Sequence, residues 1–362
     1  MKTVALLAGA RPNYMKIFPI WREIHANRRE RWIPLIIHTG QHYDPIMNDV
    51  FFADLGLPQP DHYLGIGSAP HGAQTGRTMI ALEELFMRER PDWLVVVGDV
   101  NSTLAGALVA AKMRIPLAHV EAGLRSFDRS MPEEINRLVT DAVSDLLFTH
   151  SPEADENLLR EGIPPEKIIR VGNVMIDSLV LLIEKAADSP ILGKLGLLPG
   201  RYILVTLHRP SNVDDPGQLR LLMSALDQTA RQMPVVMPLH PRTRRMLDRI
   251  EFRPATDDFF LIDALGYLDF LRLESAAALV VTDSGGVQEE TTFLGVPCLT
   301  VRPNTERPIT ISRGTNELYE PAREPLEHAI RRALERPRFR PNIEGWDGRT
   351  AGRIMDVLDQ IA

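Results

Sequence analysis

The sequence contains a single cysteine, Cys298, in 362 residues. One thiol excludes a disulfide framework and a cysteine-rich zinc site. Cys298 lies in the run Val-Pro-Cys-Leu-Thr at residues 296–300, which is typical of a buried strand. A buried free cysteine behaves as a small apolar side chain. We therefore expect a core thiol in a reducing compartment such as the cytosol.

Long apolar runs and an excess of positive charge are also missing. No apolar stretch approaches the ~20 residues that a membrane helix needs. The apolar start is cut short by Arg11-Pro12, too early for a signal peptide. The net charge of −7 leaves no electrostatic footprint for nucleic acid, although a local cluster of Arg and Lys can still bind an anion. We expect a soluble, cytoplasmic protein that binds neither nucleic acid nor a membrane.

A chain of 362 residues with 44% hydrophobic content is too long for one simple core, so two domains are expected. Strand-like apolar runs alternate with helical patterns. The first series comprises residues 3–8, 32–37, 93–97, 117–120 and 145–148; the second comprises residues 202–207, 235–239, 259–262, 278–281 and 297–301. Strands that are apolar on both faces and separated by helices predict parallel sheets. The clearest helical stripe, expected to face the core, is Ile135, Leu138, Val139, Ala142, Val143 and Leu146.

The predicted fold class is α/β, with two Rossmann-like, doubly wound domains. Residues 172–200 separate the two series of strands, so the first domain is expected at residues 1–172 and the second at residues 173–344. Ligands of open α/β sheets bind beyond the carboxyl ends of the strands. Two such domains that face each other would form an interdomain cleft, and the informative residues directly follow the strands.

The stretch Thr-Asp-Ser-Gly-Gly-Val-Gln-Glu-Glu, residues 282–290, follows a predicted strand and opens a helix. Free N–H groups at a helix start favour an anion, so Ser284, Gly285 and Gly286 predict a phosphate seat. A carboxylate one turn further along can accept hydrogen bonds from both ribose hydroxyls, which favours Glu290 and leaves Glu289 on another face, open to solvent. The pattern also fits a capped strand–helix junction without a ligand. His208, His240 and Arg307 follow other strands of this half and would face the same crevice.

In the first half, the first strand leads into Arg11 and Lys16. An Arg fork and a Lys point charge at a first βα turn suit a pyrophosphate, although exposed salt bridges would explain them too. The turn lacks the G-x-G-x-x-G pattern of a dinucleotide cofactor. Asp99, Glu121 and Glu133 follow strands or open a helix. Asp99 fits a helix cap or a catalytic carboxylate, and Glu133 also suits the positive end of a helix without any chemistry. Carboxylates that cluster in a closed cleft raise one another's pKa and supply an acid and a base near neutral pH.

Together, a phosphate seat, a ribose acceptor, clustered carboxylates and a cationic turn describe an enzyme that acts on a nucleotide sugar. The sequence contains neither a nicotinamide fingerprint nor a metal-binding constellation, so no cofactor and no metal are expected. The predicted chemistry is proton transfer coupled to loss of the nucleoside diphosphate.

These residues resemble the bacterial non-hydrolysing UDP-N-acetylglucosamine 2-epimerases from the first strand to about Arg313. The resemblance is carried by GARP (residues 9–12), GD (98–99), HVEAGLR (119–125), PEEINR (132–137), TDSGGVQEE (282–290) and TERP (305–308). It implies a GT-B fold whose C-terminal helix, within residues 345–362, crosses back to the first domain. It also implies interconversion of UDP-GlcNAc and UDP-ManNAc through UDP elimination and re-addition, a homodimer, and a role in the biosynthesis of cell-surface polysaccharides.

The resemblance also implies roles for matching residues. Asp99, Glu121 and Glu133 are acid/base candidates, and His208 contacts the phosphate or the intermediate. Arg11 and Lys16 bind the diphosphate or sugar region, and Phe270 lies near the uracil. Ser284, Gly285 and Gly286 hold phosphate, Glu290 holds the ribose and Arg307 holds the diphosphate.

The sequence departs from the family pattern at Asn13, where Glu is usual, and at Pro210 and Ser211. The segments Gln-His-Tyr-Asp (41–44) and Gln-Thr-Gly-Arg (74–77) differ from the pattern that forms a second, activating UDP-GlcNAc site. A modified relative of UDP-GlcNAc is therefore a second candidate substrate. A hydrolysing epimerase that releases ManNAc, a GT-B glycosyltransferase and a non-catalytic UDP-sugar sensor would share parts of the same pattern. The hydrolysing branch usually lacks the EAGLR and PEE strings.

Overall fold

The computed structural model describes residues 1–40 and 54–361. The chain divides into two compact units, which are treated separately. Unit 1 comprises Met1–Leu181 and Glu344–Ala362, and unit 2 comprises Leu182–Ile343. The division falls within helix α7, Val174–Ala187.

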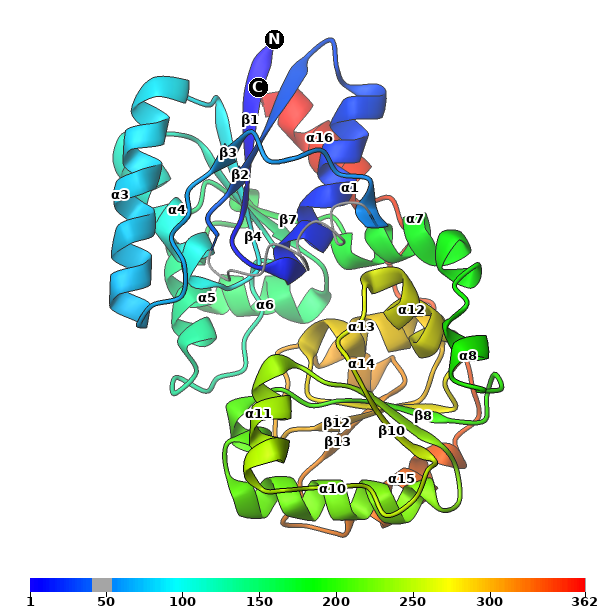
Figure 1. The fold of residues 1–362 in the computed structure, drawn as a ribbon. Coiled ribbons are helices and arrows are strands. Elements are labelled where there is room, and N and C mark those ends of the chain that lie inside the picture. Colours follow the sequence, from blue (N-terminus) through cyan, green and yellow to red (C-terminus); the bar gives the residue numbers. More distant parts are fainter. Residues whose placement is uncertain (41–53, 362) are drawn as a thin grey trace. The chain divides into compact units, whose positions relative to one another are not determined.

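Unit 1 is built on a parallel sheet with the strand order β3-β2-β1-β4-β5-β6-β7 (Figure 1). The strands are β1 (Lys2–Ala8), β2 (Trp32–His38), β3 (His62–Tyr63), β4 (Trp93–Val97), β5 (Leu117–Val120), β6 (Leu146–Thr149) and β7 (Ile168–Arg170). The chain moves outward from β1 through β2 to β3 and then returns to β4 on the other side of β1. The β1–β4 neighbourhood is therefore the topological switch point, where open α/β sheets bind ligands.

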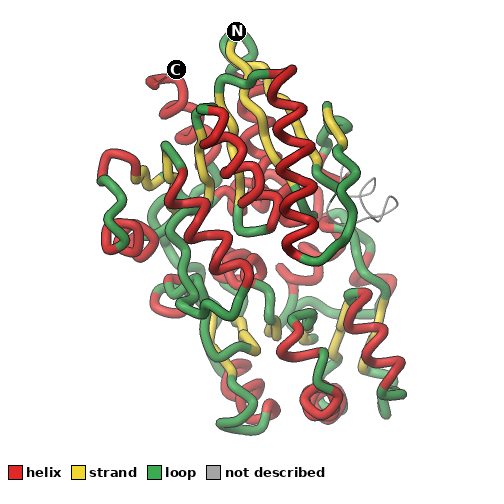
Figure 2. Tube along the Cα trace, turned by 90° about the vertical axis from the view of Figure 1, so that its left-hand side faces the viewer, coloured by secondary structure: helices red, strands yellow, loops and turns green. Residues whose placement is uncertain are grey.

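Helices lie on both faces of this sheet, α3 and α4 on one side and α1 with α16 on the other (Figures 1 and 2). Besides α7, the helices of unit 1 are α1 (Arg11–Asn27), α3 (His71–Glu89), α4 (Asn101–Met113), α5 (Pro132–Val143), α6 (Pro152–Arg160), the 3-10 turn η1 (Pro165–Lys167) and α16 (Thr350–Ile361). Both α5 and α6 begin at proline, which suits the first helical position because its missing N–H would have no helical partner there.

The C-terminal segment completes unit 1. Arg28, just after α1, forms ion pairs of 2.6 Å with both Asp356 and Asp359 of α16. The indole of Trp32 donates to Asp359 at 2.7 Å. At the start of α16, the backbone N–H of Ala351 donates to the Asp177 carboxylate at 2.7 Å. These contacts tie residues that are far apart in sequence into one packed layer.

Unit 2 repeats the same architecture with six parallel strands in the order β10-β9-β8-β11-β12-β13. The strands are β8 (Ile203–Thr206), β9 (Val235–Pro238), β10 (Phe259–Ile262), β11 (Leu279–Thr282), β12 (Cys298–Val301) and β13 (Asn316–Tyr319). The helices are α8 (Ile191–Lys194), α9 (Pro210–Val213), α10 (Pro216–Ala230), α11 (Pro241–Arg249), α12 (Tyr267–Ala276), α13 (Gly285–Leu294), α14 (Ile309–Ser312) and α15 (Leu326–Leu334). Cys298 is buried in β12 as a free thiol, as predicted. The two Rossmann-like sheets confirm the predicted α/β class and GT-B type of fold.

The prediction that the apolar stripe of α5 faces the core holds only towards its end, where Val143 packs against the core of unit 1 and Leu146, already in β6, is buried. Ile135 is 36% exposed and Ala142 is exposed, whereas the buried residues of the helix are polar: Glu134, Asn136, Arg137, Thr140 and Asp141. The polar side faces inward because its charged groups bind the loop that connects β5 to α5. The sequence period is therefore that of the helix, but the fully buried side of the helix is polar, and Leu138 and Val139 of the apolar stripe are only partly buried.

Candidate active site

Glu121 lies directly beyond the carboxyl end of β5 and is 4% exposed. Its Oε2 forms an ion pair of 2.5 Å with the Nζ of Lys16, which comes from α1 and is also buried. Gly98, at the end of β4, makes this approach possible, because a Cβ at this position would lie 2.6 Å from the Lys16 ammonium. The end of β5, the turn after β4 and the first helix thus meet around one buried charge pair.

The backbone of Glu121 is strained. Its φ of 69° lies in the left-handed region, which non-glycine residues adopt at an energetic cost. Such strain persists only where the surrounding structure holds it, and it concentrates at functional sites. Because the unusual turn accompanies the pairing with Lys16, it marks Glu121 as a functional candidate.

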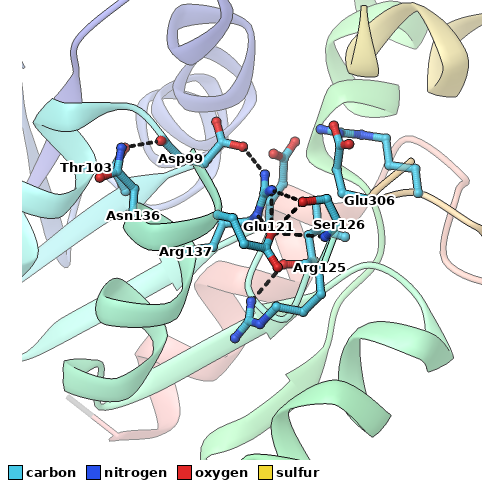
Figure 3. Close-up of polar contacts among 12 residues, drawn as sticks. Asp99, Thr103, Glu121, Arg125, Ser126, Asn136, Arg137 and Glu306 are labelled. Atoms are coloured by element: carbon cyan, nitrogen blue, oxygen red, sulfur yellow. Dashed lines mark hydrogen bonds and ion pairs between the residues drawn. The ribbon is translucent and has the colours of Figure 1, made fainter. Parts of the chain in front are cut away.

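Asp99 and Glu133 lie around the same edge of the sheet. Asp99 follows β4, retains 27% side-chain exposure and pairs with the guanidinium of Arg137 from α5 (Figure 3). Glu133 lies in the first turn of α5 and is half-buried, whereas its neighbour Glu134 is buried. Two of these three carboxylates pair with cations, Glu121 with Lys16 and Asp99 with Arg137.

The neighbour of Glu133 has a different task. Glu134 is buried and accepts hydrogen bonds from the backbone N–H groups of Ser126 and Phe127, at 3.0 and 2.9 Å. It also pairs with Arg137 at 2.6 Å. Burial would raise the pKa of Glu134, but the Ser126 backbone bond and the Arg137 charge lower it below its usual value. Glu134 therefore remains ionised and fixes the loop that leads into α5.

Asp141 organises the rest of the HVEAGLR segment. It is buried and lies 2.6 Å from His119 Nδ1 and 2.7 Å from Arg125 Nη2, and it accepts from the Gly123 N–H at 3.1 Å. Burial would raise its pKa, but the charges and hydrogen bonds of His119 and Arg125 lower it instead. The other ring nitrogen of His119 bonds the carbonyl of Gly98 at 2.9 Å, so the network reaches the turn beside Lys16.

Asn13, where the family pattern has Glu, acts locally as a brace. Its Oδ1 accepts from the N–H groups of Gly9 and Ala10, and its Nδ2 donates to the carbonyl of Val97. It thereby joins the turn after β1 to the end of β4. Arg11 is the first residue of α1, beside this brace.

In unit 2, the predicted phosphate seat begins α13. Ser284 is the N-cap of this helix, and Ser284, Gly285 and Gly286 are all partly exposed. A side chain on Gly285 would meet the guanidinium of Arg307 and the carboxylate of Glu306, so the glycine lets this cation lie against the helix start. A bare helix N-terminus next to an arginine is a favourable seat for a phosphate.

The arginine is held by two buried carboxylates. Arg307 Nε lies 3.1 Å from Glu289, and its Nη1 pairs with Glu306. Glu306 also pairs with Arg302 at 2.7 Å. Burial would raise the pKa of Glu306, but Arg307 and Arg302 lower it well below its usual value. Glu289 is fully buried, so the expectation that it is open to solvent is wrong; it serves as a partner of Arg307.

His208 is attached to the same turn through Asp283. The buried Asp283 carboxylate accepts from the N–H groups of His208 and Arg209 and lies 2.9 Å from His208 Nδ1. Burial would raise the pKa of Asp283, but the bonds and charge of His208 lower it. The His208 side chain is 41% exposed, and its ring lies 5.7 Å from that of His240. It is therefore both oriented and accessible.

Glu290 and Phe270 lie on facing helices. Glu290 is 3% exposed, and its Oε1 accepts a hydrogen bond of 2.6 Å from the Tyr267 hydroxyl of α12. Phe270, one turn further along α12, is partly buried against the core that includes Tyr202 and Val280. Sequence reasoning missed Tyr267 as a partner of Glu290, because nothing in the pattern signals contact between helices 23 residues apart.

Of the proposed second site, residues 41–44 lie outside the described residues. Gln74 is buried in α3 and accepts from Asn101 at 2.8 Å. Across residues 1–40 and 54–361, no group of three or more His, Cys, Asp or Glu side chains is arranged to hold a metal ion. In the same part of the chain, no helix has both the length and the apolar character that crossing a bilayer requires.

Comparisons with known proteins agree on one family. The model of the UDP-N-acetylglucosamine 2-epimerase family matches residues 25–359. A UDP-N-acetylglucosamine 2-epimerase of Methanocaldococcus jannaschii is 41% identical over 98% of both chains. A UDP-2,3-diacetamido-2,3-dideoxy-D-glucuronate 2-epimerase of Pseudomonas aeruginosa is 43% identical over 100% of both chains.

A solved structure gives the same result. The crystal structure of the M. jannaschii UDP-GlcNAc 2-epimerase in complex with UDP-GlcNAc and UDP matches with a TM-score of 0.91 and 41% identity, over 99% of this chain and 100% of that one. The match extends through both sheets and the C-terminal segment.

Proposed function

Because this chain belongs to the UDP-N-acetylglucosamine 2-epimerase family and is therefore an isomerase, we propose that it interconverts UDP-GlcNAc and UDP-ManNAc without net hydrolysis. The product would serve the biosynthesis of cell-surface polysaccharides in the cytoplasm. The proposal rests mainly on the buried Lys16–Glu121 pair near the switch point of the first sheet. In this pair, a cation fixes the position of a carboxylate.

The reaction needs departure of the nucleotide and proton transfer together. The C2–H bond is a poor acid, but departure of UDP from C1 develops positive charge there and acidifies this hydrogen. Loss of the proton and of UDP leaves 2-acetamidoglucal. UDP then re-forms its bond to C1 while a proton is added to the opposite face of C2. The enzyme must stabilise the leaving diphosphate and retain the intermediate until re-addition.

In unit 2, we assign nucleotide binding. The N-terminus of α13, with Ser284, Gly285 and Gly286, would hold the phosphates together with Arg307. Glu290 would accept from the ribose, and Phe270 would lie near the uracil. The exposed imidazole of His208, oriented by Asp283, would contact the phosphate or the intermediate.

In unit 1, we assign the sugar chemistry. Glu121, Asp99 and Glu133 are the acid/base candidates at the carboxyl edge of the sheet. Arg11 and Lys16 would contact the diphosphate or sugar region. Lys16 also sets the orientation of Glu121, because the two groups form a buried pair.

Isotope exchange tests this function. Incubation with UDP-GlcNAc in D2O is expected to place deuterium at C2 of both UDP-ManNAc and recovered UDP-GlcNAc, as read by NMR. Release of free ManNAc and UDP would instead indicate hydrolysis, and product formed only with an added acceptor would indicate a glycosyltransferase. Retention of the C2 proton with no product would indicate a UDP-sugar sensor.

A second substrate is favoured by one comparison. The P. aeruginosa relative, matched over the full length of both chains, acts by its name on UDP-2,3-diacetamido-2,3-dideoxy-D-glucuronate. The same exchange experiment with that sugar as competitor compares the two substrates in one tube. The sugar with the higher kcat/KM for deuterium incorporation is the preferred one.

We further propose that two copies of the chain pair through the outer faces of α3 and α5. Ile80 and Met87 of α3 are about three-fifths exposed, and α5 presents Ile135 outward. Helix α4 contacts both α3 and α5, so these apolar groups belong to one helical layer (Figure 1). Contiguous exposed apolar patches mark interaction surfaces, and the proposal is that these side chains form one.

Sedimentation equilibrium tests this pairing. The wild-type chain is expected to sediment as a dimer, and the Ile80→Glu/Ile135→Glu variant as a monomer at micromolar concentration. Leu221→Glu, at a similarly exposed apolar position on α10 of unit 2, is the matched control and should remain dimeric. A wild-type monomer, or a double variant that still dimerises, would contradict the proposed face.

A further inference from the structure

Helix α13 carries two adjacent buried glutamates with partners of different charge. Glu289 lies 3.1 Å from the cationic Nε of Arg307. Glu290 instead accepts from the neutral hydroxyl of Tyr267 at 2.6 Å. An arginine neutralises the charge of its carboxylate, whereas a neutral tyrosine leaves the net charge in place and fixes the carboxylate by a hydrogen bond. The two glutamates are therefore equipped for different tasks.

The Tyr267 hydroxyl is rigidly placed. Tyr267 is 7% exposed and is the first residue of α12, and Gly266 precedes it as the N-cap. A hydrogen bond at 2.6 Å to Oε1 restricts rotation of the Glu290 carboxylate about its last side-chain bond. A carboxylate with one oxygen held in this way presents its remaining acceptor sites in a fixed direction, which lowers the entropic cost of binding a ligand.

Glu290 lies in a buried region with other ionisable groups, which affect its pKa. Burial raises the pKa of Glu290 to about 7, and the bond from Tyr267 opposes the shift. Glu274, fully buried in the same region, has its pKa raised well above the usual value by burial and by the charge of Glu290. A buried carboxylate in these surroundings depends on its hydrogen-bond donors to remain a good acceptor.

We propose that Tyr267 is a positioning residue for ribose recognition, because its hydroxyl holds Glu290 in the orientation that meets both vicinal hydroxyls of the nucleotide. The inference rests on the proposed function, in which Glu290 accepts from the ribose. To accept hydrogen bonds from two hydroxyls on adjacent ring carbons, a carboxylate must lie in one orientation. A single hydroxyl can be bound by a carboxylate in a wider range of orientations. Tyr267 therefore increases the preference of the site for a ribonucleotide over a 2′-deoxyribonucleotide.

Titration calorimetry with UDP and 2′-deoxy-UDP tests the inference. The wild-type protein is expected to bind UDP roughly tenfold or more tightly than 2′-deoxy-UDP, the difference that one hydrogen bond to a charged group gives. Glu290→Gln should lose most of this preference. Tyr267→Phe should lower the preference at least threefold, mainly by weakening UDP, and should raise KM for the nucleotide sugar while kcat stays within about twofold.

Tyr202→Phe is the matched control. Tyr202 is also a buried tyrosine, and its hydroxyl donates to the carbonyl of Leu273 in the same helix α12. The variant removes a buried hydroxyl without touching Glu290, so it should retain the wild-type preference even if its Tm falls as far as that of Tyr267→Phe. A Tyr267→Phe protein that keeps the full preference overturns the role of Tyr267 alone. A wild-type protein without any preference overturns the ribose assignment of Glu290 and this inference with it.

Discussion

Replacement of Glu121 by Gln is expected to lower kcat for epimerisation roughly 10²–10⁴-fold, the usual contribution of a general acid or base. The amide has nearly the same shape as the carboxylate but cannot take up a proton. Glu121 is the most buried of the three candidate carboxylates and has a strained backbone. Its partner Lys16 holds it in one position at the switch point of the sheet. The rate is measured by incorporation of deuterium at C2.

The variant also leaves the ammonium of Lys16 buried without its carboxylate, which costs about 3–5 kcal/mol when one partner of a buried pair is removed. The double variant Lys16→Met/Glu121→Gln separates the two effects, because it removes both charges. It should regain much of the lost Tm and remain inactive. Glu161→Gln, which removes a carboxylate paired with Arg125 in the same unit, should keep near-wild-type kcat. Activity of Glu121→Gln within about threefold of wild type would exclude proton transfer by Glu121.

Replacement of Asp141 by Asn is expected to destabilise unit 1 by about 3–5 kcal/mol, since His119 and Arg125 would lose a buried counter-charge. For a unit of this size, the Tm would fall by roughly 6–20 °C. Asp347→Asn is the matched control. Its pair with Arg353 is about half exposed on the carboxylate side, so its loss should cost under ~1 kcal/mol. Thermal unfolding followed by circular dichroism measures both.

The pH dependence of the fall in Tm follows from the direction in which folding shifts the pKa of Asp141. The folded state lowers the pKa of Asp141 below its ordinary value, so the stabilisation is present above the unfolded pKa of about 3.9 and disappears as the pH falls through the folded value. The Tm difference between wild type and Asp141→Asn should therefore be constant from about pH 5 to pH 8 and shrink only below about pH 4. A difference that already shrinks near pH 6 would contradict the assignment of the network to Asp141.

Much of the fold could be predicted from the sequence because buried parallel strands are continuous apolar runs. The runs at residues 93–97, 117–120 and 259–262 coincide with β4, β5 and β10. The missed strands, β3, β7 and β13, lie at the edges of their sheets. Two are very short and β13 reads Asn-Glu-Leu-Tyr, so these three strands lack an apolar run, whereas the edge strand β10 reads Phe-Phe-Leu-Ile and was predicted.

Candidate site residues could be selected from the sequence where a carboxylate comes at or near the end of a strand, as Asp99 and Glu121 do. Their contacts were not predictable where the partner comes from a distant segment. Lys16 and Glu121 are 105 positions apart, and Tyr267 meets Glu290 across two helices. The polar character of the buried side of α5 has the same origin. Asp141 and Glu134 have charged and backbone partners in the folded loop, and this compensation outweighs the apolar stripe that a sequence pattern registers.

The return of the C-terminal segment to unit 1 also sets an order of assembly. Unit 2 is one uninterrupted stretch, Leu182–Ile343, whereas unit 1 needs residues on both sides of it. On the ribosome, the later unit is therefore the first to have all its residues available, and the outer side of α1 stays uncovered until α16 emerges. Domains usually fold in the order of their synthesis. In this chain, the earlier unit lacks its last helix until the later one has been made, and Trp32, whose indole donates to Asp359 of α16, is without that partner in the meantime.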